Sequence, residues 1–132
     1  MKWFFSLLLL TNVIIADYTA KPLDKKLYDS KIKIIDIRTT GEWLKTGIVK
    51  GSIPIMFFDE RGNYNLELFL DELNKNITPG ERFALICDTG SRTKVLGIPL
   101  GQEMGYNVID LRGGIQYAIA KKIPLEAYKP KN

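Results

Sequence analysis

Histidine is absent from this sequence of 132 residues, and cysteine occurs once, at Cys87. Without histidine the chain cannot form a Cys–His nucleophilic pair, a Ser–His–Asp triad or a His-ligated metal site. A single cysteine excludes an intramolecular disulfide and a zinc cluster built on cysteines. Any nucleophilic chemistry in this chain must therefore proceed without a histidine base.

A dense basic run is also missing. The chain has 19 Lys and Arg against 15 Asp and Glu, a formal net charge of +4, and the basic residues are spread along it. Nucleic-acid binding normally needs a clustered basic face, so we do not expect a nucleic-acid partner. A mildly basic surface suits small anionic substrates, although ordinary solvated lysines give the same balance. Hydrophobic residues make up 45% of the chain, which suits one packed domain of this length.

The chain also has no apolar run of the roughly 20 residues that a membrane-spanning helix needs. Residues 1–16 instead carry one early charge, Lys2, followed by an apolar core that ends at Ala16. This layout is typical of a secretory signal peptide, so we expect residues 1–16 to be removed and residues 17–132 to form a single domain. The expected location is the bacterial periplasm. Ile14 is larger than the residue preferred three positions before a cut, so an uncleaved membrane anchor is the alternative.

From Asp17 onward, strand and helix patterns alternate. Residues 31–38 contain four isoleucines within six positions, a β-branched run that predicts a buried strand. Further strands are predicted at 83–87, at 108–111 and at 53–55, where Pro54 indicates a strand end or a sheet edge. The predicted helices cover 65–76, 93–104 with a kink or irregular turn at Pro99, and the segment from Gly114 to about Lys121. The alternation predicts an α/β fold, a mostly parallel central sheet with helices on both faces.

The single cysteine lies where such a fold binds its ligands. Cys87 ends the predicted strand 83–87, and ligands of open α/β sheets bind beyond the carboxyl ends of the strands. The loop that follows leads into a predicted helix, so several of its backbone N–H groups can point at one anion. Gly90 permits a positive φ, and Arg92 supplies a forked cation suited to oxyanions. These features favour a reactive thiolate. The alternative is an inert cysteine buried as a small hydrophobic side chain.

Several segments within residues 31–125 resemble the rhodanese family of sulfurtransferases. The matching motifs are Asp36-Ile37-Arg38 with Glu42-Trp43, Gly47-Ile48-Val49-Lys50-Gly51-Ser52, the six-residue active loop Cys87 to Arg92, and the closing motif Leu111-Arg112-Gly113-Gly114-Ile115. Departures from the family pattern are Ile48 for His, Ser52 for Ala, Ala118 near a common Trp, and Asp88 where many members have a basic residue.

The resemblance implies a two-step transfer of sulfur. The Cys87 thiolate would take the outer sulfur of a small anionic donor such as thiosulfate, and the resulting persulfide would pass that sulfur to cyanide, a thiol or a protein acceptor. Cys87 is the expected catalytic residue. The expected substrate-binding residues are Asp88, Thr89, Gly90, Ser91 and Arg92, whose amides would stabilise the charged persulfide. Such a reaction needs neither a metal nor an organic cofactor.

Two other functions fit the same residues. A Cys-x5-Arg phosphatase also holds a thiolate under a ring of amides, but only four residues separate Cys87 from Arg92 here. The tighter loop should suit sulfur better than phosphate. A non-catalytic module, in contrast, would carry or sense a persulfide for a partner without turnover.

The other motif residues are expected to have structural roles. Because buried charges are usually paired, we expect Asp36, Arg38 and Glu42 to form a set of ion pairs and hydrogen bonds near the loop. Trp43 is expected in the core. The glycines of the closing motif, residues 113–114, are expected to allow close backbone approach.

Overall fold

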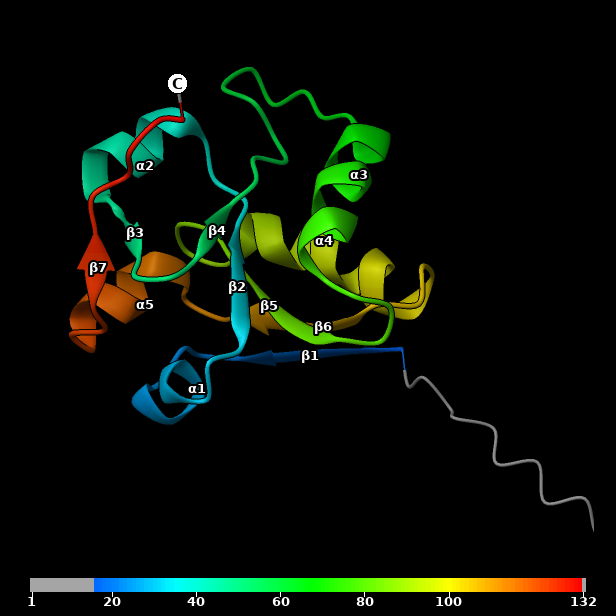
Figure 1. Ribbon diagram of the computed structural model, residues 1–132, viewed down its shortest axis with the longest axis horizontal. Helices are drawn as coiled ribbons and strands as arrows, with labels where there is room; N and C mark the ends of the chain where they lie inside the picture. Colours follow the sequence, from blue (N-terminus) through cyan, green and yellow to red (C-terminus); the bar gives the residue numbers. More distant parts are fainter. Residues whose placement is uncertain (1–15, 132) are drawn as a thin grey trace, which may run out of the picture.

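The structure, a computed structural model, describes residues 16–131 and contains a central sheet of five parallel strands in the order β1–β6–β5–β2–β4 (Figure 1). The strands are β1 Asp17–Lys21, β2 Lys33–Asp36, β3 Ile48–Val49, β4 Ile53–Pro54, β5 Arg82–Ile86, β6 Asn107–Leu111 and β7 Leu125–Glu126. The helices are α1 Lys25–Asp29, α2 Thr40–Thr46, α3 Leu66–Asn76, α4 Ser91–Gln102 and α5 Gly114–Ala120. Strands β3 and β7 pair antiparallel as a small second sheet. The predicted fold class is confirmed.

The alternation of side chains along the strands divides the apolar core into two halves. Phe83, Leu85 and Cys87 belong to the half that includes residues of α3 and α4. Ala84 and Ile86, which alternate with them, belong to the half that includes residues of α1 and α5. Helices therefore cover both faces of the sheet (Figure 1).

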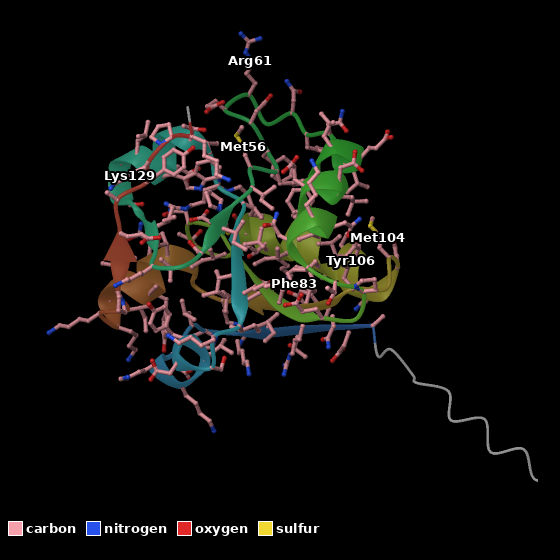
Figure 2. All side chains as sticks on the ribbon, viewed as in Figure 1. Met56, Arg61, Phe83, Met104, Tyr106 and Lys129 are labelled. Atoms are coloured by element: carbon pink, nitrogen blue, oxygen red, sulfur yellow. The ribbon has the colours of Figure 1, made fainter. Side chains whose placement is uncertain are left out.

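The two ends of the sheet differ in character. At the amino ends, Phe83 of β5 and Tyr106 just before β6 pack edge to face, with ring centroids 6.1 Å apart (Figure 2). At the carboxyl ends, β5 leads into the loop that begins with Cys87, and β6 leads through Arg112 and Gly113 into α5. The aromatic pair closes the core at one end, and the loops that carry the candidate chemistry occupy the other.

The predicted long elements are present with adjusted bounds. The strand expected at 31–38 is the shorter β2, and the short strand with Pro54 is β4, which ends at that proline on an edge of the sheet. Helix α3 begins as predicted after Asn65, whose side chain accepts a hydrogen bond of 3.0 Å from the Leu68 amide. Helix α4 continues past Pro99 to Gln102, so the proline does not interrupt it. Because proline has no N–H group, the carbonyl of Val95, four residues earlier, receives no helical hydrogen bond from Pro99. Val95 lies on the exposed side of the helix.

Several short elements lack a clear sequence pattern. Helix α2 has only Trp43 and Leu44 as apolar residues, so no helical period shows. What starts it is a capping box, in which Thr39 and Glu42 bond each other's backbone amides. Strand β1 forms the edge opposite β4 and pairs in parallel with β6.

Two glycines of α4 bring that helix close to β1. A Cβ atom on Gly101 would lie 2.8 Å from the Asp17 carbonyl oxygen, and one on Gly97 would lie 3.0 Å from the Tyr18 ring. The backbone of α4 therefore rests directly on the edge strand.

Within residues 16–131, no helix has both the length and the apolar character to cross a membrane. The expected signal segment lies outside the described residues, except for Ala16.

Candidate active site at Cys87

Cys87 lies at the junction of β5 and the loop that leads to α4, and none of its surface is exposed. Its Sγ accepts a hydrogen bond of 3.2 Å from the Gly90 amide and lies 3.5 Å from Thr93 Oγ1. Gly90 adopts φ +109°, which confirms the predicted positive φ and allows the chain to fold back over the sulfur. The sulfur thus lies beneath a tight turn.

The amino end of α4 has no side-chain cap. Gly90 occupies the N-cap position, where Ser, Thr, Asp or Asn would normally accept a hydrogen bond from the first turn. The first-turn N–H groups of any helix have no partner within the helix, and they carry its partial positive charge. The uncapped first turn, Ser91 to Thr93, gives this loop the properties of an anion-binding site.

The guanidinium of Arg92 is paired with a carboxylate within the domain. Its Nη1 and Nη2 donate to the two carboxylate oxygens of Glu42, each over 2.6 Å. This pair lowers the pKa of the Glu42 carboxyl, because the guanidinium stabilises the charged form. Sequence reasoning expected the fork to face a substrate oxyanion and placed Glu42 with Asp36. The ion pair joins residues 50 positions apart, so no local spacing indicates it.

Asp36 and Arg38 form a separate, fully buried ion pair. The guanidinium donates to the Asp36 carboxylate, with Nη2 2.9 Å from Oδ2, and also to Thr46 Oγ1 and the Gly47 carbonyl, each at 2.9 Å. Trp43 Nε1 donates to Asp36 Oδ1 over 3.0 Å, and the Trp43 side chain is buried. The structural role predicted for Asp36 and Arg38 is confirmed, as is the core position of Trp43.

Helix α5 is fastened to the first residues of the loop. The Ile115 amide donates to the Cys87 carbonyl over 2.9 Å, and the Gln116 amide donates to the Asp88 carbonyl over 3.2 Å. A Cβ atom on Gly114 would lie 2.4 Å from the Asp88 oxygen and 2.5 Å from the Cys87 oxygen. The predicted close backbone approach is confirmed for Gly114, whereas a Cβ atom on Gly113 would meet the side chain of Tyr117.

The remaining loop side chains point in different directions. Asp88 Oδ1 accepts a hydrogen bond of 2.8 Å from Gln116 Nε2, so its carboxylate is turned toward α5. Thr89 and Ser91 are exposed. The structure therefore brings the Gly90 amide and the Thr93 hydroxyl to the sulfur, while the charged side chains of the loop are held by neighbouring elements.

A buried polar set behind the sulfur was not predicted from the sequence. Thr93 Oγ1 lies 2.6 Å from Asp110 Oδ1, and the other oxygen of Asp110 accepts a hydrogen bond from the Tyr18 hydroxyl. Asp110 is 4% exposed and lies within the apolar strand Val-Ile-Asp-Leu. A carboxylate in an otherwise buried strand is the signal that would have indicated this set.

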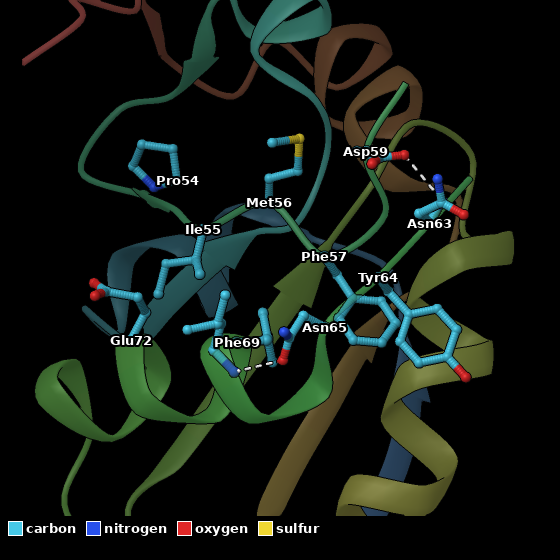
Figure 3. A pocket seen from close by; sticks show the side chains of 11 residues that line it. Pro54, Ile55, Met56, Phe57, Asp59, Asn63, Tyr64, Asn65, Phe69 and Glu72 are labelled. Atoms are coloured by element: carbon cyan, nitrogen blue, oxygen red, sulfur yellow. Dashed lines mark hydrogen bonds between the residues drawn. The ribbon is translucent and has the colours of Figure 1, made fainter. Parts of the chain in front are cut away.

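A surface groove of about 560 Å³ lies between α3 and the segment that follows β4 (Figure 3). Phe57 and Tyr64 stack within it, with ring centroids 5.0 Å apart. Phe57 also belongs to the apolar cluster that contains Cys87, but none of residues 87–92 lines the groove. Within residues 16–131, no three Cys, Asp or Glu side chains gather closely enough to hold a metal ion.

The sequence pattern of the Rhodanese-like domain matches residues 19–120 of the chain. This chain belongs to the rhodanese-like domain family. As such it is a member of the sulfurtransferase superfamily or a related cysteine-dependent domain. No curated protein matches this rhodanese-like domain.

Solved structures share the fold of this rhodanese-like domain. A rhodanese-related protein from Thermoplasma volcanium is 23% identical, with a TM-score of 0.58 over 82% of this chain and 99% of that one. A rhodanese-like domain protein from Staphylococcus aureus is 16% identical, with a TM-score of 0.56 over 88% of this chain and 99% of that one. Rv0390 from M. tuberculosis is 16% identical, with a TM-score of 0.59 over 74% of this chain and 80% of that one.

Proposed function

We propose that this domain transfers a sulfane sulfur from a small donor such as thiosulfate to a thiophilic acceptor through a persulfide on Cys87. The observation that supports this most directly is the position of Cys87 Sγ, 3.2 Å from the Gly90 amide and just before the uncapped first turn of α4. Helix amino ends and backbone N–H groups favour negative charge on a bound sulfur. The substrate-binding role assigned to residues 88–92 belongs to the same proposal.

In the first step, the Cys87 thiolate attacks the outer sulfur of thiosulfate. A bond forms between Sγ and that sulfur, the bond to the sulfonate sulfur breaks, and sulfite leaves with the electron pair. In the second step, cyanide or a thiolate attacks the outer sulfur of the persulfide. The Sγ–S bond then breaks, which regenerates the thiolate and releases thiocyanate or a new persulfide. Fixed backbone donors stabilise the anionic persulfide between the two steps.

The charge that meets an anionic donor comes from the backbone in this proposal. Arg92 is neutralised by Glu42, and the nearby Asp88 carboxylate carries the same sign of charge as the donor. The N–H groups of Gly90 and of the first turn of α4 supply the positive potential. The charge pattern of the loop therefore suits a modest rather than a tight affinity for thiosulfate.

Mass spectrometry of the purified chain tests the assignment. Treatment with thiosulfate should add about 32 Da, the mass of one sulfur, and cyanide should then remove it as thiocyanate. Cys87→Ser should show neither adduct nor turnover, with circular dichroism as the control for folding. Retention of both by Cys87→Ser would refute the assignment. An adduct without turnover would identify a persulfide carrier, and hydrolysis of an aryl phosphate without sulfur transfer would identify a phosphatase.

We also propose that the domain acts in the periplasm after cleavage behind Ala16. The charged start and the apolar core of residues 1–16 support this proposal. N-terminal sequencing of periplasmic material should find Asp17 as the first residue. Intact Met1 in the membrane fraction would instead identify the segment as an anchor.

A further inference from the structure

Asp110 is a buried carboxylate whose hydrogen-bond partners are two hydroxyl groups. Thr93 Oγ1 lies 2.6 Å from one carboxylate oxygen, and the Tyr18 hydroxyl bonds the other. Within residues 16–131, no lysine or arginine forms an ion pair with Asp110. Both hydroxyls donate to the carboxylate oxygens.

Tyr18 has the properties of a donor to a charged group. Its pKa is raised above the usual value, first by burial and then by the hydrogen bond to Asp110. The phenol therefore acts as a hydrogen-bond donor to one carboxylate oxygen, and Thr93 donates to the other.

Thr93 connects this carboxylate to the sulfur. Its hydroxyl has one proton and three acceptors within reach, namely Asp110 Oδ1 at 2.6 Å, the Gly90 carbonyl at 3.1 Å and Cys87 Sγ at 3.5 Å. The carboxylate oxygen is the closest of the three acceptors, so it receives the proton. Thr93 Oγ1 then presents a lone pair to Sγ, and a lone pair binds a thiol proton but repels a thiolate.

We propose that Asp110 is a positioning residue that, through Thr93, turns an oxygen lone pair toward Cys87 Sγ and so limits the reactivity of the sulfur. The Gly90 amide and the nearby Arg92 guanidinium favour negative charge on the sulfur instead. The Thr93 oxygen therefore opposes these two groups. This inference takes Cys87 as the nucleophile of the proposed function.

The rate at which iodoacetamide alkylates the full chain at pH 7 measures this effect. Because the chain has one cysteine, the carbamidomethyl adduct counted by mass spectrometry reports on Cys87 alone. Asp110→Asn removes the charge that Thr93 links to the sulfur, and we expect alkylation about tenfold faster. Tyr18→Phe leaves Thr93 as the remaining donor to Asp110, which strengthens its hold on that proton. We therefore expect alkylation about threefold slower.

Two variants of Thr93 test the connection itself. Thr93→Ser keeps the hydroxyl and should react at close to the wild-type rate. In a Thr93→Val background, the acceleration from Asp110→Asn should shrink to about threefold or less, because the hydrogen-bonded link is gone. An undiminished acceleration in that background would overturn the route through Thr93.

The opposite directions separate this role from a purely structural one. Loss of packing would expose the sulfur in both variants and speed both reactions, so acceleration of Tyr18→Phe would overturn the proposal. Alkylation of folded Asp110→Asn at or below the wild-type rate would overturn it as well. If Asp110→Asn does not fold, the direction of the Tyr18→Phe effect decides. Alkylation needs no sulfur donor, so failure to form a persulfide would refute the proposed function and leave this test intact.

Discussion

The ion pair between Glu42 and Arg92 allows a clean perturbation, because Glu42→Gln removes a charge and little else. Gln keeps the shape of the side chain and is accepted at the third position of a capping box, so the bonds to Thr39 are retained. The substitution removes the negative charge from two hydrogen bonds of 2.6 Å that the Arg92 guanidinium donates. The change therefore reports on how α2 is tied to the start of α4.

The size of the effect follows from the exposure of the pair. The Arg92 and Glu42 side chains are 24% and 31% exposed, so the pair is neither fully solvated nor fully buried. A solvated pair contributes about 0.2–1 kcal/mol, and breaking a buried pair costs about 3–5 kcal/mol. We expect Glu42→Gln to lower the free energy of unfolding by about 1.5 kcal/mol at pH 7. For a domain of this size, that corresponds to a Tm lower by about 6 °C.

The pH dependence gives this prediction its sign. Because the folded-state pKa of Glu42 lies below its usual 4.5, its contribution is complete above that value and disappears as pH falls through the lowered one. Urea unfolding of both proteins from pH 7 down to about pH 3 should therefore show the two stabilities converging. The matched control is Glu72→Gln, which breaks the more exposed pair with Lys75 and should cost less. A difference between wild type and Glu42→Gln that stays constant with pH would refute the ionic origin of the effect.

Three further changes have defined outcomes. Gly114→Ala should lower the free energy of unfolding in urea by at least about 3 kcal/mol, because its Cβ meets two carbonyl oxygens. The control Gly51→Ala, also at positive φ but with nothing within 4 Å of the added Cβ, should cost about 1 kcal/mol. Equal costs would show that the contact with the loop does not matter. Tyr18→Phe should flatten the fall in stability above about pH 10. Because the folded-state pKa of Tyr18 is raised, its contribution to stability is complete below the usual 10.0 and is lost as pH rises through the raised value. An unchanged slope of stability against pH would contradict the bond to Asp110. Asp88→Asn should lower the KM for thiosulfate, more so at low salt, and an unchanged KM across a salt series would mean that this carboxylate does not act through charge on the donor.

The fold was predictable where sequence pattern and burial coincide. The β-branched run around Ile34 and Ile35 and the apolar run before Cys87 became adjacent central strands, because both lie in the buried middle of the sheet. The apolar face of residues 65–76 predicted α3 correctly, and the Asn65 cap that begins this helix was seen only in the structure. Helix α2 was not predicted, because its stability depends on a capping box and on the buried Trp43 rather than on an apolar stripe.

The site was predictable in its backbone and less so in its side chains. The place of Cys87 at a strand end and the positive φ of Gly90 follow from local chain geometry. The partner of Arg92 does not, because Glu42 is brought to it only by the packing of α2 against the loop. Asp110 was hidden for a similar reason, since its two hydroxyl partners come from a different strand and a different helix.

Strand β1 packs against α4, the helix that follows the cysteine loop, so the edge of the sheet helps to hold the site in place. An edge strand has a hydrogen-bonded neighbour on one side only, so it belongs to the segments that open most readily in local unfolding. Opening of β1 would withdraw Tyr18 from Asp110 and remove the contact beneath Gly97 and Gly101 at the same time. Amide hydrogen exchange along β1 under native conditions would therefore measure how often this strand opens and its contacts behind the cysteine loop are lost.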